Sequence, residues 1–175
     1  PLILMAPKSL LRHKRCVSPV ADLEQGAFEE VLDDPEPPGN PARVALCSGK
    51  VFYDLLEFRE QEGIRDTALV RVEQFYPFPE RKLRAALARY PGARELVWAQ
   101  EEPQNRGGWT FIGPRLRALA PAMTLRYSGR PASASPAAAS LRLHKQEQAE
   151  LVRLTFEGGL YCEVPPPPPA AATGA

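Results

Sequence analysis

The turn Ser48-Gly49-Lys50 is the strongest candidate for chemistry in this sequence. It stands between a predicted strand over 42–47 and a predicted helix over 50–62. Backbone N–H groups at the start of a helix can hold an anion, and Lys50 would add a positive charge. The turn is no Walker-type phosphate loop, because Val44 occupies the position of the upstream glycine. A glycine-enabled turn with a solvated lysine explains the same residues.

A basic cluster follows the first predicted strand, over 2–6. Its members are Lys8, Ser9, Arg12, Lys14 and Arg15. If this strand lies beside the strand over 42–47, the cluster and the turn form one shared pocket. The residues of this predicted anion or effector site are Lys8, Ser9, Arg12, Ser48, Gly49 and Lys50. The alternative is a solvated surface that pairs with the acidic stretch between Asp22 and Glu36.

Other polar residues near predicted strand ends are interpreted as structural or as interface residues. Glu101 and Glu102 follow a predicted strand over 95–100. Adjacent residues of an extended chain point to opposite sides, so they form a poor acid–base pair. The whole set comprises Arg71, Glu73, Tyr76, Glu101, Glu102, Asn105, Trp109 and Arg130. No serine, cysteine and histidine are arranged as a nucleophilic triad, and the two histidines have no ligand-spaced partners for a metal.

Strands and helices alternate along the chain with short connections, which predicts an α/β fold. We expect three layers, α/β/α, around a mostly parallel five-stranded sheet with strands over 2–6, 42–47, 67–73, 95–100 and 124–127. Five helices are predicted. They cover Ser18 to Val31, 50–62, the regions around 83–90 and 112–119, and Ser140 to about 156. Residues 1–158 form the predicted domain. Residues 159–175, rich in Pro and Ala, form a predicted disordered tail.

Composition excludes several classes of protein. The chain has 175 residues with 22 basic and 21 acidic side chains, and this balance argues against a nucleic-acid-binding surface. No apolar run approaches the roughly 20 residues that a membrane span needs. The three cysteines are far apart, which argues against a disulfide framework and indicates a reduced, cytosolic setting. Because the sequence begins with Pro1 inside a predicted strand, we expect it to be part of a longer polypeptide.

Five segments, taken in order, carry a family resemblance. They are Pro7 to His13, Cys47 to Leu56, Arg71 to Pro79, Trp98 to Asn105 and Tyr127 to Ala137. The series resembles the C-terminal domain of the first component of 2-oxoglutarate dehydrogenase, the thiamine-diphosphate-dependent decarboxylating subunit, over nearly all of 1–158. Two departures from the family pattern are the loop Asn105-Arg106-Gly107-Gly108-Trp109 and the proline-rich tail.

The resemblance implies a transketolase C-terminal-like fold. It implies a whole enzyme of the tricarboxylic acid cycle that decarboxylates 2-oxoglutarate on thiamine diphosphate with magnesium and passes the succinyl group to dihydrolipoyl succinyltransferase. It also implies a homodimer, with this domain helping assembly. The catalytic, cofactor-binding and metal-binding residues of the family lie in upstream domains, so none is assigned here and the fragment alone is expected to be inactive. We expect a cytoplasmic location in a bacterium and the mitochondrial matrix in a eukaryote.

Two other classes of function remain open. One is a regulatory module that binds acetyl-CoA, another acyl-CoA or a nucleotide phosphate at the predicted anion site. It would belong to this enzyme, to a 2-oxoadipate dehydrogenase or to a 2-oxoglutarate decarboxylase. The other is a free-standing small α/β enzyme, which turnover of a 2-oxo acid by the isolated chain would indicate.

Overall fold

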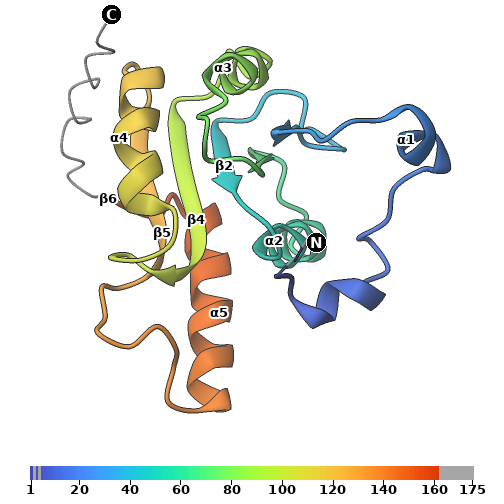
Figure 1. Ribbon diagram of the computed structural model, residues 1–175. Helices are drawn as coiled ribbons and strands as arrows, with labels where there is room; N and C mark the ends of the chain where they lie inside the picture. The colour runs from blue at the N-terminus through green and yellow to red at the C-terminus, as the bar shows by residue number, and fades with distance from the viewer. Residues whose placement is uncertain (2, 4, 162–175) are drawn as a thin grey trace, which may run out of the picture.

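A six-stranded sheet organises the protein, of which this computed structural model describes residues 1, 3 and 5–161. The strands are β1 (Val31–Leu32), β2 (Arg43–Cys47), β3 (Thr67–Val72), β4 (Glu95–Pro103), β5 (Thr124–Arg130) and β6 (Leu160–Tyr161). Their order across the sheet is β1-β3-β2-β4-β5-β6 (Figure 1). The four central strands are parallel, and the two short edge strands are antiparallel to their neighbours.

Helices cover both faces of this sheet, so the predicted α/β/α layering is confirmed. The helices are η1 (Lys8–Arg12, a 3-10 helix), α1 (Val20–Gln25), α2 (Val51–Gln61), α3 (Glu80–Ala88), α4 (Trp109–Leu119) and α5 (Leu141–Phe156). On β2, Val44 and Leu46 pack with α3 and α4, whereas Ala45 and Cys47 pack with α2 and α5. Both sets are buried, because successive strand residues point to opposite faces and both faces are covered.

Four of the predicted strands correspond to β2, β3, β4 and β5, and the mostly parallel sheet is confirmed. The predicted first strand over 2–6 is not found. Residues 2 and 4 lie outside the described part of the chain, while Ile3, Met5 and Ala6 are exposed and belong to no strand. The position beside β3 is occupied by β1 instead. The described residues of the apolar run, Ile3, Met5 and Ala6, therefore pair with no strand.

The predicted helix from Ser18 to Val31 is also corrected. Helix α1 ends at Gln25, and Gly26 follows as its C-cap in an extended conformation. Val31 and the residue after it leave the helical pattern because they pair with Val72 and Arg71 of β3. Strand pairing has overridden an apolar spacing that fits a helix.

The domain continues slightly further than the predicted boundary at 158. Gly158 and Gly159 both have positive φ angles, a conformation that glycine adopts without strain, and they turn the chain after α5. Leu160–Tyr161 then pairs with β5 as β6, within the predicted tail. The rest of that tail, 162–175, lies outside the described residues. Within the described part of the chain, no helix is both long and apolar enough to cross a bilayer.

Candidate functional site

A cavity of about 340 Å³ lies at the carboxyl ends of β2 and β4, the edge at which parallel α/β sheets usually bind ligands. Pro7 and Leu10 contribute one wall, from the segment around η1. The turn 48–50, the end of β4 at Glu101 and Glu102, and the glycines Gly107 and Gly108 before α4 contribute others. The two predicted parts of the anion site are therefore neighbours in space.

Lys50 forms ion pairs with two carboxylates at this edge. Its Nζ lies 2.9 Å from Asp54 Oδ2 and 3.1 Å from Glu101 Oε1. The Nε2 of Gln148, on α5, donates to the same two oxygens at 2.8 and 2.9 Å. Burial alone would lower the pKa of Lys50, but the hydrogen bonds and charges of the two carboxylates outweigh it and raise the pKa. The four side chains tie α2, β4 and α5 together.

A third carboxylate, that of Glu73, accepts a hydrogen bond from the backbone of the turn. Gly49 has a φ of +66°, and its N–H donates to Glu73 Oε1 at 3.3 Å. The same oxygen lies 3.9 Å from Arg71 Nε. An anion that approaches this turn must therefore compete with carboxylates of the chain itself.

The side chains of Lys8, Ser9 and Arg12 are exposed on η1 and do not line the cavity. The basic segment therefore reaches the cavity beside the turn at 48–50 with the apolar residues Pro7 and Leu10, and not with its charged side chains. An anion site at these residues stays a prediction.

Gln100 is a buried hydrogen-bonding centre that the sequence analysis did not single out. Its Oε1 accepts from Trp98 Nε1 and from the backbone N–H of Trp109, both at 2.9 Å. Its Nε2 donates to three backbone carbonyls, those of Glu102, Pro103 and Arg106. The sequence did hold a signal for this role, because a glutamine stands at the end of an apolar predicted strand. A buried amide side chain must form hydrogen bonds, so its partners could have been sought.

Two residues predicted to be structural hold the loop between β5 and α5. Asn105 Nδ2 donates to the carbonyl of Ser133, and Asn105 Oδ1 accepts from the N–H of the same residue, both at 3.0 Å. Arg130 lies 2.8 Å from Glu147 of α5 and donates to the carbonyl of Glu101 at 2.9 Å. These contacts join the loop after β4 to β5 and α5.

The remaining predicted residues lie in varied surroundings. Arg71 stacks its guanidinium over the ring of Phe52 at 4.5 Å. Trp109 is buried at the start of α4, and its ring lies 5.1 Å from that of Tyr127. Glu102 is exposed, and Tyr76 is 83% exposed. The exposure of Tyr76 leaves its predicted interface role open.

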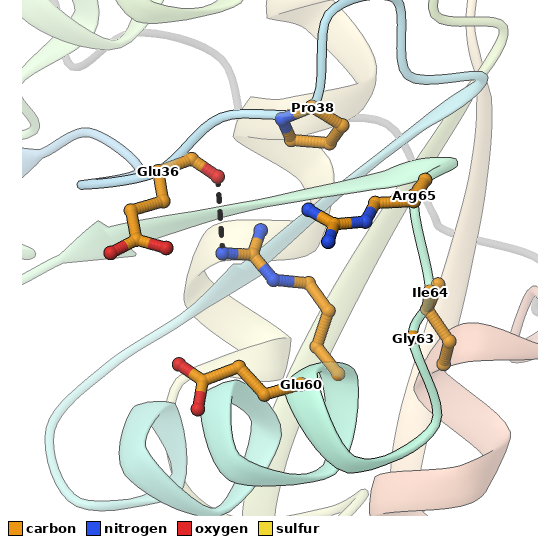
Figure 2. A pocket seen from close by; sticks show the side chains of 7 residues that line it. Glu36, Pro38, Glu60, Gly63, Ile64 and Arg65 are labelled. Carbon is orange, nitrogen blue, oxygen red and sulfur yellow. Dashed lines mark hydrogen bonds between the residues drawn. The ribbon is translucent and has the colours of Figure 1, made fainter.

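Figure 2 shows another cavity, of about 210 Å³, at the opposite end of α2. Arg59 is one of its lining residues and donates to the carbonyl of Glu36 at 3.3 Å. The same guanidinium pairs with the buried carboxylate of Asp34, with one Nη2–Oδ1 distance of 3.0 Å. Asp34 also accepts from the N–H of Leu69 at 2.8 Å. These bonds fasten the loop after β1 to the core, so the polar groups here serve structure.

The polar side chains at the carboxyl edge of the sheet are arranged to hold loops and helices in place rather than to catalyse a reaction. Polar side chains at the carboxyl edge hydrogen-bond to one another or to backbone that they hold in place, as Lys50 and Gln100 do. Within 1, 3 and 5–161, no three His, Cys, Asp or Glu side chains are grouped as ligands for a metal ion.

Comparison with solved structures supports the fold. The chain is similar to a structure described as a split-gene transketolase in an inactive beta4 tetramer, with a TM-score of 0.53. The two are 15% identical, and the match covers 75% of this chain and 42% of the other. The predicted transketolase-like fold is thereby confirmed.

Comparison with known sequences places the chain in a family. Residues 17–156 match the family described as "2-oxoglutarate dehydrogenase C-terminal". A 2-oxoglutarate dehydrogenase E1 component of Cupriavidus necator is 46% identical over 159 residues, and one of Azotobacter vinelandii is 44% identical over 162. Each match covers 89% of this chain but 17% of the relative, so the chain spans about a sixth of their length. The chain belongs to the 2-oxoglutarate dehydrogenase C-terminal family.

Proposed function

We propose that this chain is the non-catalytic C-terminal assembly domain of a 2-oxoglutarate dehydrogenase E1 component. One observation carries the proposal. At the sheet edge where an α/β domain usually binds ligands, Lys50 is paired with Asp54 and Glu101, and Gln100 is hydrogen-bonded to Trp98 and to backbone groups. These groups brace loops and helices, which fits a supporting role beside catalytic domains.

The whole enzyme would oxidatively decarboxylate 2-oxoglutarate and transfer the succinyl group to dihydrolipoyl succinyltransferase in the tricarboxylic acid cycle. Thiamine diphosphate, with magnesium, supplies the electron sink for decarboxylation when it is bound. The described residues of this chain offer no fitting site, because the edge carboxylates Asp54, Glu73 and Glu101 already pair with Lys50, Gln148 and Gly49. We assign the cofactor to upstream domains. The enzyme would act in a bacterial cytoplasm or in the mitochondrial matrix of a eukaryote.

A domain exchange tests the supporting role. Residues 17–156 of this chain replace the matching C-terminal segment of the Cupriavidus necator E1 component, and 2-oxoglutarate-dependent turnover is measured. We expect deletion of that segment to abolish activity and the exchange to restore it. An exchange carrying Gln100→Leu should restore less, because the loop after β4 loses its support. A deleted enzyme that keeps full turnover would contradict the proposal.

Calorimetry of the 175-residue chain with thiamine diphosphate and magnesium tests the non-catalytic assignment. We expect no heat of binding at cofactor concentrations up to the millimolar range, which is far above the affinity of a dedicated site. Binding at about micromolar concentration would refute the assignment. Turnover of any 2-oxo acid by this chain would favour the free-standing enzyme.

A regulatory module is the second candidate, in this enzyme or in one that acts on 2-oxoadipate. The shared cavity of Pro7, Leu10 and the turn 48–50 favours it. Thermal unfolding with and without acetyl-CoA is the test. A ligand that binds Lys50 should raise the melting temperature of the wild type. The increase should be larger for Glu101→Gln, because that change removes a competing negative charge, and it should be absent for Lys50→Ala. Equal shifts in all three proteins would dismiss this site.

A further inference from the structure

Helix α5 extends beyond the body of the domain at the carboxyl edge of the sheet. Figure 1 shows its orange half, which holds the start of the helix, projecting past the arrowhead of β4. The buried residues of α5 all lie between Leu151 and Phe156, so its first ten residues, 141–150, bury no side chain. A helix of about ten residues is marginal in water without a buried face. The first half of α5 therefore lacks the packing that normally stabilises a helix.

The loop before α5 is also exposed, but it is held in place. Every residue from 131 to 146 except one is exposed. Asn105 forms two hydrogen bonds with the backbone of Ser133, and Arg106 Nη2 donates to the carbonyl of Ala134 at 2.9 Å. A loop that is fixed before it binds a partner loses little conformational entropy on binding.

A cavity of about 190 Å³ lies between this loop and the body of the domain. Arg130 and Glu147, which form an ion pair at 2.8 Å, contribute its charged wall. Its other walls are largely small and apolar, from Pro103, Pro131, Ala132, Pro136, Ala137 and Ala138. Leu141 and Leu143, in the first turn of α5, are 69% and 40% exposed and extend this apolar surface. Clustered apolar exposure of this kind marks an interaction site.

The charges at the start of α5 oppose the helix dipole. Arg142 stands in the first turn and Lys145 follows it, while the first turn holds no acidic residue. The start of a helix carries a partial positive charge, so cations there are unfavourable and carboxylates are favourable. Among residues 1, 3 and 5–161, neither Arg142 nor Lys145 forms an ion pair. This end of α5 therefore complements an acidic partner.

We infer that residues 131–146, called the docking surface here, bind an acidic surface of the upstream catalytic domains of the E1 component. That surface presents carboxylates to Arg142 and Lys145 and apolar side chains to Leu141, Leu143 and the cavity. A half-helix that buries nothing by itself needs a permanent neighbour rather than a transient partner. The rest of the enzyme supplies one, because the chain spans 17% of its relatives' length.

This inference rests on the proposed supporting function and specifies the surface through which the support acts. The two can fail separately. The turnover of the exchange enzyme, which carries residues 17–156 in the Cupriavidus necator E1 component, measures whether the domain supports catalysis. The experiments below measure only what covers the docking surface.

Hydrogen exchange of the backbone amides is the first test. Amides 144–149 should exchange quickly in the isolated 175-residue chain and at least about 30-fold more slowly in the exchange enzyme, because docking stabilises this half of α5. The unmodified Cupriavidus necator E1 component, which needs no exchange to fold, should protect its matching amides to a similar degree. Equal rates in the isolated chain and in both enzymes would overturn the inference.

Arg142→Glu combined with Lys145→Glu is the second test, because it should have opposite effects in the two samples. In the isolated chain the new carboxylates suit the helix dipole, so amides 144–149 should exchange about 2- to 10-fold more slowly than in the wild type. In the exchange enzyme the same carboxylates face an acidic surface, so these amides should exchange about 10-fold faster or more. A change in the same direction in both samples would contradict an acidic partner.

Arg81→Glu combined with Arg94→Glu is the matched control, an equal charge change at exposed positions outside the docking surface. It should leave the exchange of amides 144–149 unchanged in both samples. A control that accelerates exchange in the exchange enzyme as much as the reversal on α5 would overturn the inference, because a general effect of charge would then explain both.

Carbodiimide cross-linking identifies what covers the docking surface, because it joins a lysine to a carboxylate in contact with it. With the exchange enzyme and dihydrolipoyl succinyltransferase both present, Lys145 should join to an Asp or Glu of the upstream domains. Lys145→Arg should abolish this product and keep the protection of amides 144–149. A product of Lys145 with the succinyltransferase or with the C-terminal domain of another copy, or no product at Lys145, would overturn the inference.

Discussion

The side-chain oxygen of Gln100 accepts the backbone N–H of Trp109 at 2.9 Å, so a residue within β4 caps the start of α4. The first N–H groups of a helix have no partner within the helix. Here the partner comes from the strand, while the amide nitrogen of Gln100 holds the loop in between through three carbonyls. The loop at the carboxyl edge is thus fixed from inside the core.

Gln100→Leu is expected to lower the free energy of unfolding by about 3–5 kcal/mol, because several buried polar groups lose their partners together. Urea denaturation followed by tryptophan fluorescence measures the change. Gln146→Leu, on the exposed surface of α5, is the control and should change stability by less than about 0.5 kcal/mol. Similar losses in both variants would show that Gln100 does not act as a centre.

Asp34→Asn should destabilise the protein by about 3–5 kcal/mol, because it leaves the buried Arg59 without its counter-charge. Adding Arg59→Met should recover part of this loss, since no uncompensated charge then remains buried. The control is Glu60→Gln on the same helix as Arg59, which breaks the half-exposed pair with Arg15 and should cost less than about 1 kcal/mol. Chemical denaturation of the wild type and the three variants compares these changes. Equal losses from Asp34→Asn and Glu60→Gln would refute the argument.

Residue types and spacing predicted the central architecture. The continuous apolar runs at 42–47 and 67–73 indicated parallel strands covered on both faces, and they became β2 and β3. Ser140 was predicted to cap the last helix, and its side chain accepts from the N–H of Leu143. These signals are local, because each depends on neighbouring residues in the chain.

The errors concern pairings between distant residues. Val31 fits a helical spacing with Val20 and Leu23, yet it pairs with Val72, far away along the chain. The apolar run at 2–6 looks like a strand, but a strand needs a neighbour, and the edge of β3 is taken by β1. The role of Gln100 was missed for the same reason, since its partners are defined only by the folded loop.

Gly108→Ala is expected to destabilise the protein by about 1–3 kcal/mol through overpacking. A Cβ at this position would stand 2.8 Å from the ring of Phe75 and 3.0 Å from that of Trp98. Gly39→Ala is the matched control, because nothing lies within 4 Å of its added Cβ. Thermal unfolding should separate the two variants, and a Gly108→Ala protein as stable as Gly39→Ala would contradict the packing seen at the start of α4.

Stability should decline in alkaline solution, in part through Cys47. Burial raises the pKa of its thiol, so the folded state keeps the proton where the unfolded chain releases it. Above the unfolded pKa of about 8.5 the unfolded state binds fewer protons, and the free energy of unfolding therefore falls as pH rises. One such group contributes a slope of at most about 1.4 kcal/mol per pH unit.

Cys47→Ala removes this contribution and leaves the other alkaline titrations, such as those of Lys50 and Tyr90, in place. Urea denaturation between about pH 8 and 10 should therefore show a shallower decline for Cys47→Ala than for the wild type, even though the variant is less stable at neutral pH. Cys16→Ala is the control, because this thiol is exposed, and its decline should parallel that of the wild type. Parallel lines for all three proteins would mean that Cys47 ionises as easily in the folded state as in the unfolded one, which a thiol sealed between β2 and the helices α2 and α5 should not do.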